Sequence, residues 1–349
     1  MRAMVLEKIS SLADNEAPLR LCEWPEPVAG DGEILIRVAA CGVCHTEIDE
    51  IEGRLPPPRL PVVPGHQAVG RVAALGERDS LEVLQRSGLQ VGDRVGVAWI
   101  NSACGHCDFC LGGLENLCPS FRATGLDAHG GYAQYMSVRA DFACRLPENL
   151  SDVEAAPLLC AGAIGYRSLS LSNLQDGQTL GLTGFGASAH LVLALVRHRF
   201  PGSPVVVFAR SAEERAFALE LGASWAGDTR DRSPRPCAAI IDTTPVWTPV
   251  VEALKNLEAG GRLVINAIRK ETVDRRALLD IDYPEHLWRE KEIKTVANVT
   301  RRDVREFLQL AAEIPLRPAV ETFRLEEANR ALLELKQRHV RGAKVLVIN

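Results

Sequence analysis

The spacing of apolar residues along the chain changes near residue 150. Before that point, short runs rich in valine and isoleucine are separated by Gly- and Pro-containing turns, as is typical of a β-rich domain. These runs are EILIRVAA (33–40), QAVGRVAAL (67–75), DRVGVAW (93–99) and YAQYMSV (132–138). From about Asn173, short apolar runs that are typical of buried strands alternate with longer segments that are typical of helices. This alternation predicts a parallel sheet with crossover helices.

The second region contains most of the predicted regular structure. Its expected strands cover 178–184, 204–210, 238–244, 261–268 and 292–299, and its expected helices cover 187–198, 211–223 and 248–257. One more helix over 302–314 and a last strand over 343–349 follow. The fold class expected from this pattern is α/β, with a β-rich domain and a doubly wound parallel sheet.

The composition indicates the general class of protein but not its function. A length of 349 residues suggests about two domains. With 46% hydrophobic and 24% charged residues, the chain is typical of a globular protein. A net charge of −5 gives no reason to expect nucleic acid or a membrane as partner. The first ten residues, MRAMVLEKIS, contain no long apolar run, so a cytoplasmic location is expected.

Four of the ten cysteines are clustered in one loop. Cys104, Cys107, Cys110 and Cys118 follow the spacing C-x2-C-x2-C-x7-C, which lets four thiolates converge on one ion. Such a site has no open position, so we expect a structural zinc ion; an iron–sulfur cluster or buried free cysteines are the alternatives. The loop contains no Lys or Arg, which argues against nucleic-acid binding.

A glycine-rich turn follows the first strand of the second region. Gly184, Gly186 and Ala189 fit G-x-G-x-x-G/A at a strand–helix junction, which predicts dinucleotide binding. At the end of the next strand, where an NAD site normally carries an acid, the chain has Ala209, Arg210 and Ser211. Arginine suits a 2′-phosphate, so the sequence favours NADP(H) over NAD(H). Arg210 could instead simply begin a solvated helix.

The stretch CGVCHTEIDE, residues 41–50, combines thiols, a histidine and acids. A redox pair of Cys41 and Cys44 is disfavoured, because no thioredoxin-like βαβ pattern lies beside it. Cys41 is then expected to be a small buried residue, and Cys44 to belong to a metal site.

Taken together, several motifs resemble those of the zinc-dependent alcohol dehydrogenases of the medium-chain dehydrogenase/reductase superfamily. They are CHT at 44–46, PGHQAVG with His66, the four-cysteine loop, LLCAG with Cys160, and GFGASA at 184–189. The resemblance implies a GroES-like β-rich catalytic domain (1–155 and 297–349) and a Rossmann domain (156–296), with a catalytic zinc in the cleft between them.

The resemblance also implies the roles of individual residues. Cys44, His66 and Cys160 would bind the catalytic zinc, giving two zinc ions per chain, and three protein ligands would leave a fourth position for water or alcohol. Thr46 would accept the alcohol proton while hydride passes to the nicotinamide. His45 would contact the cofactor phosphate. As an alternative, His45 and Thr46 could simply cap a helix.

Three positions depart from the family pattern: Glu47 where many relatives have Asp, Gln67 where they have Glu, and Asp49 where they have a relay histidine. The first two lie around the metal, where changes of partner alter affinity or activity. Trp99 resembles an aromatic wall of the substrate pocket, although core packing explains it equally well.

The resemblance leaves three functions to compare. The first is an alcohol dehydrogenase or aldehyde reductase acting on primary or small secondary alcohols. The second is a polyol or other secondary-alcohol dehydrogenase, and the third is a non-catalytic zinc-loop interaction protein. The family forms dimers or tetramers, so a homo-oligomer is expected.

Overall fold

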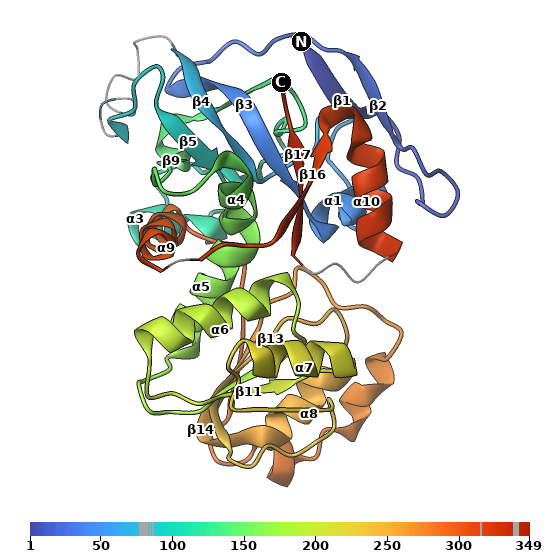
Figure 1. Cartoon of the computed structure of the whole chain (residues 1–349), viewed down its shortest axis with the longest axis vertical. Helices are drawn as coiled ribbons and strands as arrows, with labels where there is room; N and C mark the ends of the chain where they lie inside the picture. The colour runs from blue at the N-terminus through green and yellow to red at the C-terminus, as the bar shows by residue number, and fades with distance from the viewer. Residues whose placement is uncertain (77–82, 84, 86, 315, 338–341) are drawn as a thin grey trace. The chain divides into compact units, whose positions relative to one another are not determined.

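The computed structural model of the chain describes all residues except 77–82, 84, 86, 315 and 338–341 (Figure 1). The described residues form two compact units. Unit 1 comprises Met1–Cys160 with Val299–Asn349, and unit 2 comprises Ala161–Asn298. Among the described helices, none has both the length and the apolar character needed to cross a bilayer.

The main sheet of unit 1 has seven strands and is mixed. Its order is β16-β17-β3-β4-β5-β9, and β8 also pairs with β3. The strands are β3 (Glu33–Val43), β4 (Ala68–Leu75), β5 (Arg94–Val97), β8 (Tyr135–Arg139), β9 (Ala143–Arg145), β16 (Val320–Arg324) and β17 (Ala343–Val347). β17, red in Figure 1, pairs antiparallel with the blue β3, so both ends of the chain contribute to this sheet.

Short ribbons and helices complete unit 1. The ribbons are β1 (Arg2–Leu6) with β2 (Leu19–Glu23), and β6 (Ile100–Ser102) with β7 (Arg122–Ala123). The helices are α1 (His45–Ile51), α3 (Asp108–Leu111), α4 (Asp152–Pro157), α9 (Arg301–Glu313) and α10 (Ala328–Gln337), with the shorter turns η2 (Glu115–Leu117), η3 (Ala140–Phe142), η4 (Leu158–Gly162) and η7 (Leu325–Glu327). The apolar faces of β3 and β4 meet side chains from β1, α1 and α10 in one hydrophobic core.

Unit 2 is a six-stranded parallel sheet with helices packed on it. Its order is β12-β11-β10-β13-β14-β15, which is the order of the dinucleotide-binding doubly wound fold. The strands are β10 (Leu180–Thr183), β11 (Val205–Phe208), β12 (Trp225–Gly227), β13 (Cys237–Asp242), β14 (Leu257–Ile265) and β15 (Glu292–Thr295). The helical segments are α5 (Ala163–Ser172), α6 (Ala187–Arg199), α7 (Ala212–Glu220), α8 (Thr248–Asn256), η5 (Arg275–Asp280) and η6 (Tyr283–Leu287). All residues of β10 and β11 are buried, as expected for central strands covered on both faces.

The structure confirms the predicted α/β class and the predicted strands and helices, with shifts at their ends. The sequence pattern missed the shortest strands, such as β6 and β12, because three residues give no measurable periodicity. It also missed α1, whose buried face carries the acids Glu47, Asp49 and Glu50 among its apolar residues. A helix with buried acids does not show the usual apolar stripe.

Candidate functional site

Three separate segments of unit 1 bring Cys44, His66 and Cys160 together. Cys44 precedes α1, His66 lies just before β4, and Cys160 lies in the π-helical turn η4, a geometry often found at functional sites. Their ligand atoms all lie within 4.8 Å of one another, and the two Sγ atoms are 4.0 Å apart. Two thiolates bound to one tetrahedral zinc would lie about 3.8 Å apart. The three side chains therefore fit a zinc ion and leave a fourth position for another ligand.

Glu47 connects two of these side chains. Its carboxylate is fully buried; Oε1 lies 2.5 Å from His66 Nδ1, and Oε2 accepts the Cys44 backbone N–H at 2.9 Å. The second contact is also half of the capping box that starts α1. Because Nδ1 is engaged, His66 has only Nε2 for a metal, and this carboxylate–histidine pairing is the usual support of a zinc ligand.

The contact between the two thiols shifts their pKa values in opposite directions. A hydrogen bond from Cys160 holds the pKa of the Cys44 thiol well below its usual range, although burial opposes this shift. The same contact, together with burial, raises the pKa of Cys160 well above its usual range. A dication binds thiolates, so metal binding at this cluster should release the Cys160 proton.

Cys41 takes no part in this cluster. It is fully buried, and burial raises the pKa of its thiol far above the usual value. Its sulfur packs against Gly65 and Gly131, where an added Cβ would lie within 3.0 Å of it. A redox pair needs an accessible thiolate, so the geometry favours a metal site over a CGVC redox pair.

Of the other residues predicted for this site, some lie beside the three candidate metal-binding side chains and others do not. Thr46 Oγ1 lies 3.7 Å from Cys44 Sγ, and the Trp99 ring meets the His66 ring edge-on at 6.5 Å between centroids. His45 is exposed in the first turn of α1. Asp49 is buried and accepts a hydrogen bond from Arg54 Nε at 2.5 Å. Thr46 and Trp99 are therefore at the cluster, whereas the Asp49 carboxylate is engaged by Arg54.

The Gln67 side chain lies over Gly42, near the carboxyl end of strand β3. A Cβ placed on Gly42 would come within 2.5 Å of the Gln67 side-chain oxygen. A larger residue at position 42, two residues before Cys44, would therefore displace the Gln67 side chain.

The four predicted cysteines of the loop also converge. The ligand atoms of Cys104, Cys107, Cys110 and Cys118 lie within 4.8 Å of one another, and Cys104 Sγ is 3.8 Å from Cys110 Sγ. Backbone amides point at the sulfurs: Gly105 N–H at Cys110 (3.4 Å) and Ser120 N–H at Cys118 (3.3 Å). Backbone amides also lower the pKa of Cys104 to about 6, so this thiol is a thiolate at neutral pH. The loop thus fits a four-thiolate zinc site with no open position.

The glycine-rich turn lies at the carboxyl end of β10, the first strand of the unit 2 sheet. Gly184 has φ +73°, a conformation that favours glycine, and Gly186 is the N-cap of α6. Nothing lies within 4 Å of a Cβ built on Gly186, so the backbone there is open to a ligand. Ala189 is fully buried. The free amides of the first turn of α6 suit a pyrophosphate.

Arg210 and Ser211 connect β11 to α7. Arg210 is exposed, and within the described parts of the chain its guanidinium has no hydrogen-bond or acidic partner. The Ser211 hydroxyl accepts the backbone N–H groups of Glu213 (3.2 Å) and Glu214 (3.4 Å), so it caps α7. Arg210 is therefore free to meet a phosphate, and the Ser211 oxygen already serves the helix.

Comparison with known proteins decides the family. Residues 30–148 match the family model described as "Alcohol dehydrogenase GroES-like domain". The chain is 42% identical over 331 residues to a probable alcohol dehydrogenase, AdhA, of Mycobacterium tuberculosis, covering 95% of this chain and 93% of the relative. It is 33% identical over 337 residues to an alcohol dehydrogenase of Geobacillus stearothermophilus, covering 94% and 95%. The chain belongs to the alcohol dehydrogenase family.

Solved structures agree with this assignment. The alcohol dehydrogenase of Aeropyrum pernix superposes with a TM-score of 0.83 at 25% identity, covering 99% of this chain and 100% of that one. A cobalt- and zinc-bound alcohol dehydrogenase of Pyrobaculum aerophilum gives the same TM-score at 22% identity, covering 99% of each chain, and supports the fold alone. The predicted membership of the medium-chain dehydrogenase/reductase superfamily is confirmed, as is the fold with a GroES-like and a Rossmann-like part.

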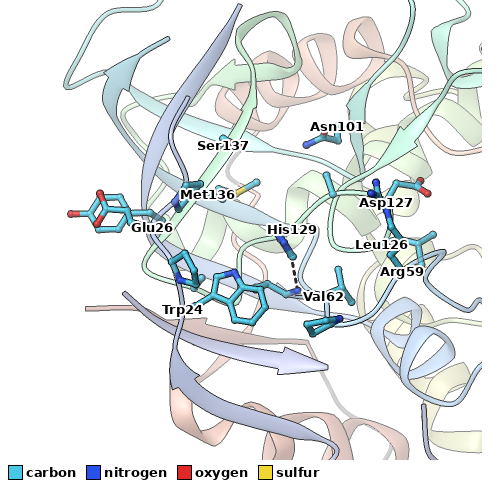
Figure 2. A pocket seen from close by; sticks show the side chains of 18 of the residues that line it. Trp24, Glu26, Arg59, Val62, Asn101, Leu126, Asp127, His129, Met136 and Ser137 are labelled. Carbon is cyan, nitrogen blue, oxygen red and sulfur yellow. Dashed lines mark hydrogen bonds between the residues drawn. The ribbon is translucent and has the colours of Figure 1, made fainter. Parts of the chain in front are cut away.

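The alcohol dehydrogenase also has a surface pocket of about 640 Å³ in unit 1, shown in Figure 2. Trp24 and His129 pack edge-on in it at 5.5 Å between ring centroids, and His129 Nδ1 accepts the Val63 backbone N–H at 3.1 Å. Neither the candidate zinc ligands nor Thr46 lines it. This pocket therefore lies apart from the thiol–imidazole cluster.

In the sequence of this alcohol dehydrogenase, Glu47 differs from the family pattern, but its contacts are not evident. Its contacts show that it supports both His66 and Cys44. The signal available in the sequence was the spacing: Glu47 is three residues after Cys44, which is the spacing of a capping box.

Proposed function

We propose that this alcohol dehydrogenase interconverts primary or small secondary alcohols with the corresponding aldehydes or ketones, with NADP(H) preferred over NAD(H). The observation that carries the proposal is the three-donor set of Cys44, His66 and Cys160 with Thr46 beside it. A metal site with four protein donors would only stabilise the fold, whereas three donors leave a position for an alcohol oxygen.

The proposed chemistry assigns a task to each group of the chain. A zinc ion held by the three donors would supply Lewis acidity that makes a bound alcohol easier to ionise. Thr46 Oγ1 would accept the alcohol proton and pass its own hydroxyl proton on to the cofactor ribose. Glu47 fixes the tautomer and orientation of His66. Trp99 and Phe121, whose ring centroids lie 5.8 Å apart, give the site an apolar wall. Apolar walls favour unbranched or aromatic substrates.

The cofactor preference depends on Arg210. The amides at Gly186 and the first turn of α6 would bind the pyrophosphate. The exposed guanidinium of Arg210 would pair with the 2′-phosphate. Ala209 stands where an NAD site usually has an acid that binds the ribose 2′-hydroxyl. His45 would add a contact to the cofactor phosphate, and Asp49 would take the place of the relay histidine.

The test measures reduced-nicotinamide absorbance with a series of alcohols, with NAD⁺ and NADP⁺ side by side. We expect zinc-dependent turnover that a strong chelator abolishes, and a higher kcat/KM with NADP⁺. Arg210→Ala should lower kcat/KM for NADP⁺ roughly ten-fold or more and leave NAD⁺ nearly unchanged, because a charge-assisted contact to one phosphate is lost. Equal losses with both cofactors would refute the Arg210 assignment.

A second pair of variants tests Thr46. Thr46→Val should reduce kcat roughly 100-fold, a typical contribution of a positioned proton acceptor. Thr46→Ser keeps the hydroxyl and should retain most activity. Comparable losses in both variants would remove Thr46 from the proton path.

The same substrate series separates the alternatives. Polyol turnover exceeding that of simple alcohols would favour the polyol or secondary-alcohol dehydrogenase. No turnover in either direction with two zinc ions bound would favour the non-catalytic zinc-loop protein. A cytoplasmic location stays a prediction.

A further inference from the structure

A lysine with a largely buried side chain lies just beyond β14 in unit 2. The Lys270 side chain is 8% exposed, and its ammonium donates to the Asp242 carboxylate and to the backbone oxygens of Thr244 (2.7 Å) and Val246 (3.1 Å). An ammonium group has three protons, so these acceptors use all of them. Lys270 therefore has no proton left for a direct bond to a ligand.

The Asp242 carboxylate connects Lys270 to the central strands of the sheet. Asp242 ends β13, is fully buried, and accepts the hydroxyls of Thr183 (2.5 Å) and Thr244 (2.7 Å). Thr183 ends β10, the neighbouring strand. β10 and β13 are the two strands between which the order of the sheet reverses, and dinucleotides bind at that reversal.

The residues after Lys270 contact the loop 243–247, which joins β13 to α8, at further points. The Glu271 backbone N–H donates to the Pro245 carbonyl at 2.7 Å. The Asp274 carboxylate accepts the backbone N–H groups of Trp247 (3.0 Å) and Thr248 (2.7 Å). Segment 270–274 thus fixes both the carbonyl and the amide groups of the loop that joins β13 to α8.

This loop packs directly against the glycine-rich turn. A Cβ on Gly184 would lie 3.0 Å from Thr244 Cγ2 and 3.1 Å from Thr243 Oγ1. Thr243 also donates its hydroxyl to the Thr183 carbonyl at 2.9 Å. The position of Thr243 and Thr244 therefore limits where the Gly184 backbone can lie.

We propose that Lys270 is a positioning residue for dinucleotide binding: through Asp242 and the carbonyls of Thr244 and Val246, it holds the loop that supports the Gly184 turn. This inference rests on the proposed function, because dinucleotide binding at residues 184–189 belongs to that proposal. Arg210 follows β11, whereas Lys270 bonds to the end of β13, on the other side of β10 in the sheet, so we expect its effect to be the same for both cofactors.

The test is a fluorescence titration of NADPH and NADH into zinc-loaded wild-type protein, Lys270→Met and Lys291→Met. Lys291 is a matched control, since its ammonium also donates to two backbone oxygens, those of Leu254 (2.6 Å) and Glu285 (2.8 Å), but not to the loop beside Gly184. We expect Kd to rise roughly ten-fold for both dinucleotides in Lys270→Met, because binding must then order the loop. Lys291→Met should bind within about two-fold of wild type, even if its unfolding temperature falls.

A folded Lys270→Met variant with wild-type Kd would overturn the inference, as would an equal rise in Kd for Lys291→Met. Since a lone buried carboxylate can prevent folding, Lys270→Met/Asp242→Asn removes both charges together. It should show the same ten-fold weakening, and wild-type affinity in it would also overturn the inference. Wild-type protein that binds neither dinucleotide would refute the proposed function instead.

Discussion

Glu47 shows how one side chain can organise a metal site from outside it. Its two carboxylate oxygens serve different partners, the imidazole of His66 and the backbone amide of Cys44. Burial alone would lower the pKa of His66, but the charges of Glu47 and the Cys44 thiolate raise that pKa well above its usual value. A metal at Nε2 would supply positive charge in place of that proton.

Glu47→Gln should weaken binding of zinc at the Cys44, His66 and Cys160 cluster roughly 10–100-fold. His66 and Cys44 contact different oxygens of the Glu47 carboxylate, and a glutamine amide has an NH₂ group in place of one of them, so one of the two contacts loses its acceptor. The measurement is competition with a chromophoric zinc chelator. Asp49→Asn is the control, because the Asp49 carboxylate contacts Arg54. Unchanged zinc affinity in Glu47→Gln would show that the Glu47 charge does not support the site.

At the scale of elements, the four-cysteine loop is tied to α9. Glu115 in η2 is buried, and its Oε1 accepts both the backbone N–H (2.8 Å) and Nε (3.0 Å) of Arg301, the first residue of α9. Arg301 also donates to Asp141 at 2.6 Å and stacks 4.8 Å from the Phe142 ring centroid. One arginine thus joins three segments that are far apart in the sequence.

Glu115→Gln should reduce the free energy of unfolding by about 1–3 kcal/mol, the range for hydrogen bonds that involve a charged group. Urea unfolding with zinc retained measures this change. Asp108→Asn, at an exposed acid of the same loop, should stay within about 0.5 kcal/mol of wild type. Equal effects of both variants would mean that the contact between Glu115 and Arg301 does not contribute to the free energy of unfolding.

Asp274 should contribute to the stability of unit 2 in a way that depends on pH. Burial would raise its pKa, but the amides of Trp247 and Thr248 hold it below its usual value in the folded protein. A carboxyl with a depressed pKa stabilises the fold above its unfolded pKa of about 3.9, and this stabilisation disappears as the pH falls through the folded pKa.

The difference in free energy of unfolding between wild type and Asp274→Asn should therefore be largest near neutral pH and shrink below about pH 4. Urea unfolding at a series of pH values checks it. Asp280→Asn, an exposed acid of the same region, should show no such trend. A difference between wild type and Asp274→Asn that stayed constant with pH would exclude the charge of Asp274 as its cause.

At the scale of the whole molecule, β15 is the end strand of the unit 2 sheet, and all four of its residues are exposed. Ile293 in it is 47% exposed, and the nearby Tyr283 and Trp288 are 60% and 58% exposed. An exposed strand edge with apolar side chains is a surface for pairing with another chain. We therefore propose that the expected homo-oligomer forms through this edge.

Ile293→Lys should shift the protein toward monomers in sedimentation velocity, because a charge at the edge disfavours pairing. Leu219→Lys is the control, at an exposed leucine (49%) of α7 in the same unit. A wild-type monomer, or equal dissociation in both variants, would refute this interface.

The sequence by itself determined the features that depend on local spacing. Apolar runs of β10, β11 and β13 predicted the parallel sheet, and two-residue gaps predicted the convergence of Cys104, Cys107 and Cys110. These features could be predicted because neighbouring residues in a turn or strand lie close together whatever the rest of the chain does.

The tertiary structure decided which distant residues meet. Cys160 joins Cys44 across 116 positions, Glu47 meets His66, and Arg301 reaches Glu115, and no local pattern specifies such contacts. The family resemblance indicated Cys160 as a zinc ligand, but nothing in the sequence indicated that Lys270 would be buried against Asp242 and beside the Gly184 turn. The reason is physical: an ammonium in a loop is normally solvated, and only the packing of β14 against β13 brings it to the carboxylate and carbonyls that pair with it.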